Sequence, residues 1–225
     1  MPSSLSPQLF FDLKQIYLGH QFEVSDLFEL LGAKLTQRLE ALLRDYEVHT
    51  NPVVRGEVSP HAILEGPVFV GEGATIGPFA YIQGPCFIAP HAEVRHGAFI
   101  RGSVYVGPKA VVGHTTEVKG SIFFDDAKAG HFAYVGDSIL GPHVNLGAGT
   151  KLANLKIKGN EVKVLHPETD AVVSSGLRKL GSILGEGVQT GCNAVLSPGS
   201  LLLPKTAVMP CVHYHGTLRK GIARG

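Results

Sequence analysis

The chain has 225 residues, a length that allows one large domain with a small appendage. Its 20 lysine and arginine residues nearly balance its 19 aspartate and glutamate residues, so no global basic field indicates nucleic acid or an anionic membrane as a partner. Three cysteines without a CxxC pair are a poor disulfide framework and favour a reducing, cytoplasmic location, while no signal peptide or membrane-spanning stretch is recognisable.

The first fifty residues differ in kind from the rest of the chain. Residues 25–31 and 34–44 have helical spacing, and the leucines of the second stretch fall on one face, at Leu35, Leu39, Leu42 and Leu43. We predict an N-terminal helical cap over residues 1–50, which covers the first coil of the following domain or packs in an oligomer.

From residue 70 onward a β-branched aliphatic residue returns at every sixth position. A small residue or a cysteine often stands four places later, and glycine often follows directly. Nine consecutive hits are not chance in a chain of this composition. The positions are Val70, Ile76, Ile82, Ile88, Val94, Ile100, Val106, Val112 and Val118.

This period predicts a triangular prism in which each six-residue side is a short strand and a turn. The aliphatic residue points into a narrow core, and successive coils stack as parallel strands about 4.8 Å apart. We therefore expect a mainly-β fold, a left-handed parallel β-helix of hexapeptide repeats, over residues 51–225. The step shortens to five residues between Val118 and Phe123 and again at Leu140, where we expect bulges.

The period is lost and then recovered in the last third of the chain. Residues 151–182 have no six-residue step, and we interpret them as an excursion that carries function or covers an edge. The six-residue step returns afterwards at Leu184, Thr190, Leu196, Leu202 and Val208, and Thr190 is the one polar residue among them.

The segment from Gly113 to Gly159 contains EVK, then GHFAYVGD, then NLGAGTKLAN. In order and nearly in spacing, this run resembles the acetyltransferase half of the bifunctional enzymes that make UDP-N-acetylglucosamine, and SGLRKLGSILG further on is similar to their archaeal-type branch. The resemblance covers roughly residues 60–210. The family's nucleotidyltransferase domain, with its glycine-rich loop, has no counterpart here, so we expect no nucleotidyl transfer from this chain; a separate partner could supply that step.

The resemblance implies roles for two catalytic residues and six substrate contacts. His131 matches the family's general base, a role that suits an imidazole near neutral pH. Asn154 matches a residue that binds the sugar and helps to hold the attacking amine, and Leu155 stands where bacterial members have tyrosine. The matched substrate positions are Arg101 and Lys119 for the phosphate, Tyr134 and Asn145 for the sugar, and Lys163 or Lys158 for the phosphate again.

The same resemblance implies acetyl-CoA as co-substrate, with no tightly bound metal. Ala148 and Gly149 keep a coil slim enough for a ligand to approach closely. Cys192 aligns with a small polar contact to the acyl carrier, and Arg219 follows the last coil as a candidate partner of the nucleotide phosphates.

The function expected from these matches is acetyl-CoA-dependent N-acetylation of an amino-sugar 1-phosphate in nucleotide-sugar and cell-envelope precursor synthesis. Glucosamine 1-phosphate is the first candidate acceptor, followed by galactosamine 1-phosphate. Prisms of this type usually assemble as homotrimers, and in the resembled family adjacent chains build each site.

Two other classes of function stay open at this point. One is a non-catalytic β-helical structural or regulatory subunit. The other is a zinc β-helix enzyme of the carbonic anhydrase type, with His114, His131 and His143 meeting at a subunit interface. The spacing of these histidines does not match that family, and the matched phosphate-binding residues would then be idle.

Overall fold

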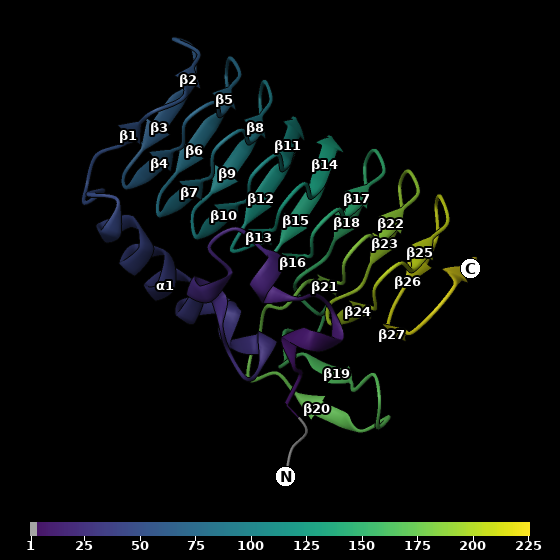
Figure 1. Cartoon of the computed structure of the whole chain (residues 1–225). Coiled ribbons are helices and arrows are strands. Elements are labelled where there is room, and N and C mark those ends of the chain that lie inside the picture. The colour runs from purple at the N-terminus through teal and green to yellow at the C-terminus, as the bar shows by residue number, and fades with distance from the viewer. Residues whose placement is uncertain (1–3) are drawn as a thin grey trace.

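The computed structural model describes residues 4–225, and most of them form a prism with three β-sheet sides (Figure 1). All strand pairs within these three sheets are parallel, and each strand pairs with the strand one coil away. The fold class predicted from the sequence, a left-handed parallel β-helix with an N-terminal helical segment, is confirmed.

Within residues 4–225, each sheet takes one strand from every coil, except that the last coil contributes none to the third sheet. The first sheet contains β1 (Val53–Val54), β4 (Val68–Val70), β7 (Cys86–Ile88), β10 (Val104–Val106), β13 (Ile122–Phe123), β16 (Ile139–Leu140), β21 (Ser182–Leu184), β24 (Ser200–Leu202) and β27 (Thr217–Leu218). The second contains β2 (Glu57–Val58), β5 (Thr75–Ile76), β8 (Glu93–Val94), β11 (Val111–His114), β14 (Lys128–His131), β17 (Asn145–Leu146), β22 (Gln189–Thr190), β25 (Ala207–Val208) and β28 (Ile222–Ala223). The third contains β3 (Ile63–Glu65), β6 (Tyr81–Gln83), β9 (Phe99–Arg101), β12 (Glu117–Lys119), β15 (Tyr134–Gly136), β18 (Lys151–Leu152), β23 (Val195–Leu196) and β26 (His213–Tyr214).

The register shows where coils shorten. Phe87 pairs with Tyr105, 18 residues on, as three six-residue sides require. Tyr105 pairs with Ile122 and Ile122 with Ile139, so these two coils have 17 residues each. The missing residues fall at the five-residue steps seen in the sequence. From β16 the chain reaches its next partner only at Ile183, because the excursion intervenes.

The inward ladder of Ile, Val and Leu residues forms one continuous core. Full burial of such a side chain stabilises the fold by about 1.5–3 kcal/mol, which makes the ladder the main support of the prism. Its polar interruption, Thr190, is buried and hydrogen-bonded: its hydroxyl lies 2.8 Å from that of Thr150 and accepts from the Gly147 amide at 3.1 Å. A threonine is tolerated there because both of its polar neighbours lie on the preceding coil.

The N-terminal segment lies along the outer face of the first sheet. It contains η1 (Pro7–Leu9), η2 (Leu13–Gln15), η3 (Gly19–Phe22), η4 (Leu27–Leu30) and α1 (Gly32–Asp45). It covers a stack of outward aromatic side chains, Phe69, Phe87 and Tyr105. Tyr46 and Phe22 pack on this stack, with ring centroids 4.9 Å from Phe87 and 4.7 Å from Tyr105. The role of residues 1–50 as a cap of the first coil or as an oligomer contact stays a prediction.

The excursion leaves the prism after β18 and returns at β21. It forms an antiparallel hairpin, β19 (Lys163–Leu165) and β20 (Val172–Ser174), and its Val162, Val164 and Leu180 side chains join the outer apolar cluster. Among the described residues, no helix combines the length and apolar character that crossing a bilayer requires.

Candidate active site

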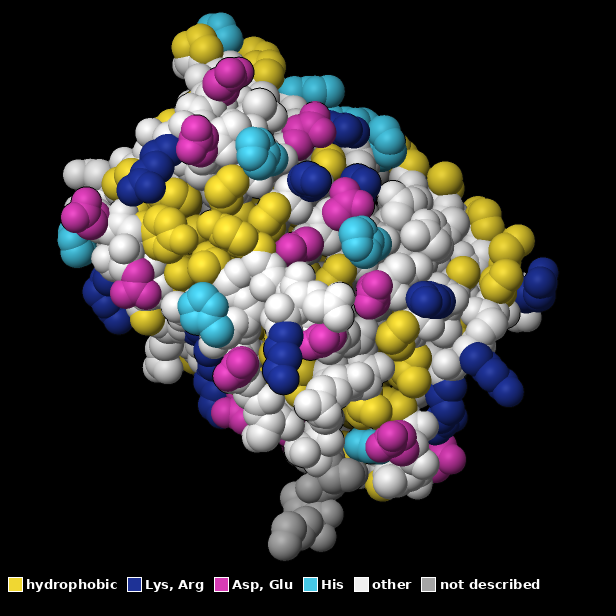
Figure 2. All heavy atoms as spheres, in the orientation of Figure 1, with side chains coloured by type: hydrophobic (Ala, Val, Ile, Leu, Met, Phe, Trp, Pro, Cys, Tyr) yellow, Lys and Arg dark blue, Asp and Glu magenta, His cyan; other side chains and the backbone are white. Residues whose placement is uncertain are grey.

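His131 ends β14 at the corner between the second and third sheets, and its side chain is exposed. Backbone hydrogen bonds align this corner from coil to coil: the amides of Phe132, Gly149 and Asn193 donate to the carbonyls of His114, His131 and Ala148. The Cys211 amide continues the series by donating to Cys192. We call His114, His131, Ala148 and Cys192 the corner column. Figure 2 shows histidine side chains spaced along the rim where β8, β11 and β14 end.

The corner column unites residues that the sequence placed in two roles. His131 was assigned to acid–base chemistry, and Ala148, Gly149 and Cys192 to the acyl carrier. Although 44 residues separate Ala148 from Cys192, the excursion does not interrupt the column, because the coil resumes in register after it. Gly149 has a φ of +70°, and a β-carbon there would lie 2.8 Å from the Phe132 ring, so only glycine fits this close approach.

A second polar group lies on the third sheet, just past the same corner. Tyr134 begins β15, three residues after His131, and its hydroxyl donates to Asn154 Oδ1 at 3.3 Å. The Asn154 amide in turn donates to the carboxylate of Asp137, which also binds Lys119. We call Lys119, Tyr134, Asp137 and Asn154 the third-sheet cluster.

Burial and local charge keep Tyr134 in its neutral form. Burial raises the pKa of its phenol above the ordinary value, and the nearby carboxylates of Glu117 and Asp137 raise it further. The hydroxyl is therefore a hydrogen-bond donor at neutral pH. The residues that the sequence proposed as sugar contacts, Tyr134 and Asn154, thus touch each other directly.

Two of the cations that the sequence assigned to the phosphate, Arg101 and Lys119, have carboxylate partners. Arg101 lies 2.7 Å from Glu117, and this hydrogen bond raises the pKa of the guanidinium. Lys119 lies 3.1 Å from Asp137. Two cations and two anions leave this surface without a net positive charge. Sequence reasoning missed Glu117 and Asp137, although both belong to the EVK and GD motifs, because nothing in the motifs shows which side chains pair.

Lys151 is a further cation that sequence reasoning missed. It is the register partner of Tyr134 on the next coil, and its ammonium donates to the Gly149 carbonyl at 2.6 Å. This places a positive charge between the corner column and the third-sheet cluster. The only sequence signal is its position, 17 residues after Tyr134 on the same outward row.

Asn145 does not join the third-sheet cluster within the chain. It belongs to β17 of the second sheet, pairs in register with Lys128 and Gln189, and is exposed while Leu146 points inward. Its side chain therefore faces outward from a different side of the prism than Tyr134 does.

Lys158 and Lys163 line a groove of about 1020 Å³ between the excursion and the last coils. Lys156, Tyr214 and His215 also line it, as do Ala153 and Leu155, the chain neighbours of Asn154. The two lysines that the sequence assigned to the phosphate are thus on a hollow that borders the third-sheet cluster, and the cluster side chains themselves do not line it.

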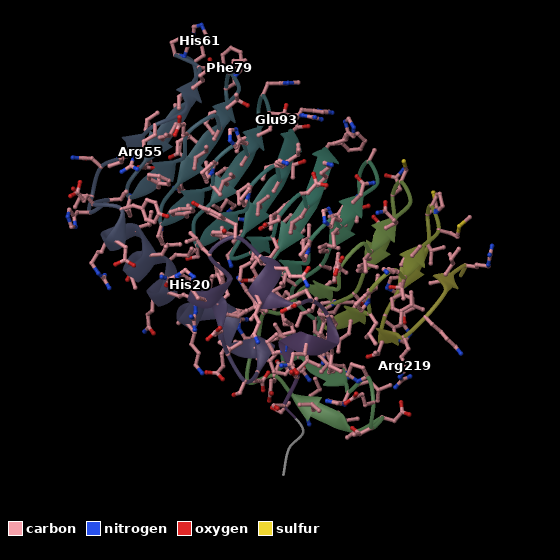
Figure 3. All side chains as sticks on the ribbon, in the orientation of Figure 1. His20, Arg55, His61, Phe79, Glu93 and Arg219 are labelled. Atoms are coloured by element: carbon pink, nitrogen blue, oxygen red, sulfur yellow. The ribbon has the colours of Figure 1, made fainter. Side chains whose placement is uncertain are left out.

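Arg219 is held by the excursion hairpin. Its guanidinium donates to the carbonyls of Pro167 at 2.5 Å and His166 at 3.4 Å, and it pairs with Asp170. Figure 3 shows it beside the hairpin, next to the last coil. These contacts join the excursion to the end of the prism, so a role toward nucleotide phosphates stays a prediction.

The three histidines of the zinc alternative do not converge within one chain. His114 and His131 are in contact at one corner, whereas His143 lies between the first and second sheets and pairs with Asp126 at 3.1 Å. Within residues 4–225, no group of three or more histidine, cysteine, aspartate or glutamate side chains has a metal-binding arrangement.

With this geometry established, comparison with known proteins decides the family. The family model described as the GMPPB C-terminal domain matches residues 82–217, more than half of the chain. The chain belongs to this family. The matched range includes the whole corner column and the whole third-sheet cluster.

Curated relatives of this member of the GMPPB C-terminal domain family match it over shorter stretches. The bifunctional sugar-1-phosphate nucleotidylyltransferase/acetyltransferase of Sulfurisphaera tokodaii is 45% identical over 75 residues, which is 33% of this chain and 18% of that protein. The bifunctional protein GlmU of Methanocaldococcus jannaschii is 42% identical over 74 residues, 33% of this chain and 17% of that protein. The chain therefore matches less than a fifth of the length of these relatives.

Solved structures with some likeness include acyltransferases. The UDP-N-acetylglucosamine acyltransferase of Francisella novicida is 11% identical with a TM-score of 0.38, and the alignment covers 76% of this chain and 62% of that one. AntD, an N-acyltransferase from Bacillus cereus solved with dTDP-4-amino-4,6-dideoxyglucose and coenzyme A, is 16% identical with a TM-score of 0.33, covering 80% of each chain.

Proposed function

We propose that this protein is an acetyl-CoA-dependent N-acetyltransferase that acts on an amino-sugar 1-phosphate, with glucosamine 1-phosphate as the first candidate. The observation that carries the proposal is that His131 stands in one column with Ala148 and Cys192 and only three residues before Tyr134 of the third-sheet cluster. An acyl carrier along the column and a sugar on the cluster would meet at His131. A relative named as a bifunctional nucleotidylyltransferase/acetyltransferase supports the same activity.

His131 acts as the general base. It removes a proton from the acceptor amine as the nitrogen attacks the thioester carbonyl carbon, so a carbon–nitrogen bond forms. The carbon–sulfur bond then breaks, and the coenzyme A thiolate leaves and takes the proton from His131. Tyr134 and Asn154 orient the sugar through the phenol and the amide, which fixes the distance from amine to thioester.

The phosphate binds mainly to Arg101. The Arg101–Glu117 pair is half-exposed, and exposed pairs contribute about 0–1 kcal/mol, so a phosphate displaces Glu117 by accepting two hydrogen bonds from the planar guanidinium fork. Lys119 keeps its more buried partner Asp137. Lys158 and Lys163 add positive charge from the bordering groove.

The assembly is a homotrimer around an axis parallel to the prism. Support comes from Asn145, which faces outward from the second sheet and so is free to complete the sugar site of a neighbouring copy whose third sheet faces it. Two measurements test this arrangement. Light scattering gives the oligomeric state, and an activity assay on an Asn145→Ala variant mixed with a His131→Ala variant tests for shared sites. Partial recovery of activity in the mixed oligomer supports shared sites, and a monomer that is fully active contradicts them.

Mass spectrometry of the product is the direct test of activity. The purified chain is mixed with acetyl-CoA and, separately, glucosamine 1-phosphate, galactosamine 1-phosphate and glucosamine without phosphate. We expect an acetylated sugar phosphate and little acetylation of the sugar without phosphate. If no amino-sugar phosphate is acetylated, the non-catalytic alternative replaces this proposal.

A further inference from the structure

His131 is in contact with a second imidazole that the proposed chemistry has not used. His114 Nε2 lies 3.1 Å from His131 Nδ1, and the ring centroids are 5.2 Å apart. A distance of 3.1 Å between two ring nitrogens is a hydrogen bond, so one of the two nitrogens carries the shared proton.

Strand pairing and a close approach at Gly113 bring these two rings together. The dipeptide Gly-His occurs at residues 113–114 and again at 130–131, on β11 and β14, and His114 and His131 are register partners. A β-carbon on Gly113 would lie 1.9 Å from the Gly130 carbonyl carbon, so β11 needs a glycine at residue 113 to approach β14 this closely. The contact is therefore built into the strands and does not depend on a flexible loop.

His114 is itself fixed on two sides. Its Nδ1 lies 3.2 Å from the hydroxyl of Thr115, and its ring stacks on His96 with centroids 5.3 Å apart and planes 9° apart. A ring held by a stack and a hydrogen bond has little freedom to turn, so its Nε2 presents a stationary partner to His131. Farther along the same rim, His61 stacks on Phe79, and Figure 3 shows both pointing outward from the turns.

We propose that His114 is a positioning residue that accepts a hydrogen bond from His131 Nδ1–H and thereby leaves His131 Nε2 unprotonated toward the substrate. This inference rests on the proposed function. In this arrangement His114 Nδ1–H donates to Thr115 Oγ1, and every ring nitrogen of the pair has a matching partner except the one that acts as base.

The protonation change during the reaction favours this direction over its reverse. When His131 takes the amine proton at Nε2, its Nδ1–H still donates to His114, so the bond survives the step. In the reverse direction His114 donates to His131 Nδ1, and His131 then carries its proton on Nε2, where a base needs a lone pair. His131 could not accept a second proton there.

Two substitutions separate positioning from packing. His114→Gln keeps a hydrogen-bond acceptor near the position of Nε2. His114→Leu keeps the bulk of the side chain and removes the acceptor. We expect His114→Leu to lower kcat by about 10- to 100-fold, part of the about 10²- to 10⁴-fold that a general base contributes, with KM for both substrates within about twofold. We expect His114→Gln to recover to within about fivefold of the parent. His143→Leu, at another corner, is the matched control and keeps parental kcat.

A measurement without turnover completes the test. Nitrogen NMR of histidine-labelled protein, with His131 assigned from a His131→Gln variant, reports which ring nitrogen carries the proton. We expect the Nδ1–H form of His131 in the parent and a shift toward Nε2–H in His114→Leu. An Nε2–H parent, or equal impairment of His114→Gln and His114→Leu, overturns the inference while the acetyl transfer stands. A parent in the Nδ1–H form that acetylates no substrate instead overturns the proposed function and supports the hydrogen-bond assignment.

Discussion

Lys119 and Asp137 are joined across adjacent coils, with the Lys119 ammonium 3.1 Å from Oδ1 and 3.3 Å from Oδ2 of a carboxylate whose side chain is only 6% exposed. The Asn154 amide donates to the same carboxylate. Asp137 therefore organises the cation and the amide that the sequence assigned to substrate, and it does so from below the surface that a substrate would touch.

Asp137→Asn should destabilise the fold. The variant leaves the Lys119 ammonium without its counter-charge and places an amide group against two donors. Because Lys119 is partly exposed, we expect a loss of about 1–3 kcal/mol, less than for a fully buried pair, and a Tm lower by about 2–4 °C per kcal/mol. Thermal melting followed by circular dichroism measures this. Glu29→Gln, which breaks the exposed pair with Lys34, is the control and should change stability by less than about 0.5 kcal/mol.

His131→Ala should abolish acetyl transfer without affecting the fold. The side chain is exposed and projects from a corner, so its removal opens no cavity in the core. We expect a loss of about 10²- to 10⁴-fold in kcat, with the oligomer and the Tm nearly unchanged. Product mass spectrometry and melting curves on the same preparation give both values. Retained turnover would remove His131 from the role of base.

Arg219→Ala should loosen the excursion hairpin. The guanidinium bonds the carbonyls of Pro167 and His166 and the carboxylate of Asp170, and these contacts contribute about 1–3 kcal/mol locally. We expect faster amide hydrogen exchange in β19 and β20, with exchange in the prism strands unchanged. The exposed neighbour Lys220 provides the control variant, Lys220→Ala. If exchange is unaltered but affinity for acetyl-CoA falls, Arg219 serves the co-substrate and not the hairpin.

Asp125 and Asp126 should respond to pH with opposite signs. Burial raises the pKa of Asp125, one of whose oxygens is buried without a hydrogen-bond partner among the described residues. Its contribution to stability is thus full below the ordinary value of 3.8 and is lost as pH rises through the raised folded-state pKa. Asp125→Asn should therefore raise the Tm at neutral pH and bring no gain in acid.

Asp126 provides the matched comparison for this pH series. Burial opposes ionisation, but hydrogen bonds from Lys128 and His143 outweigh it and lower the pKa. Its contribution is present above 3.8 and is lost as pH falls through the lowered folded-state pKa, so Asp126→Asn should lower the Tm at neutral pH. Melting curves of both variants from acid to neutral pH give the two trends, and parallel curves would contradict the assignment.

The three thiols should divide into two classes. Cys86 is fully buried in the core, and burial raises the pKa of its thiol, whereas Cys192 and Cys211 are exposed. We expect two thiols per chain to react with an aromatic disulfide reagent in the native state, and the third only in denaturant. Acetyl-CoA should slow the reaction of one of the two thiols that react in the native state, and a Cys192→Ser variant identifies that thiol. Reaction of all three in the native state would contradict the burial of Cys86.

The repeat, the inward ladder and the shortened coils can all be read from the residue order, because a six-residue period sets which side chain points inward at each step. Through the family resemblance the sequence also assigned His131 to acid–base chemistry and Ala148 and Cys192 to the acyl carrier. The GH, Y and GD motifs likewise marked the coils on which the polar residues stand.

Which of these polar residues touch can be seen only in the folded chain. Pairing between Arg101 and Glu117, Lys119 and Asp137, and His114 and His131 depends on side-chain direction across a coil spacing, which the period does not encode. The same holds for the N-terminal segment. Helical spacing was visible in the sequence only over residues 25–31 and 34–44, and the place of the segment along the first sheet follows from the outward stack of Phe69, Phe87 and Tyr105, whose outer faces apolar side chains cover.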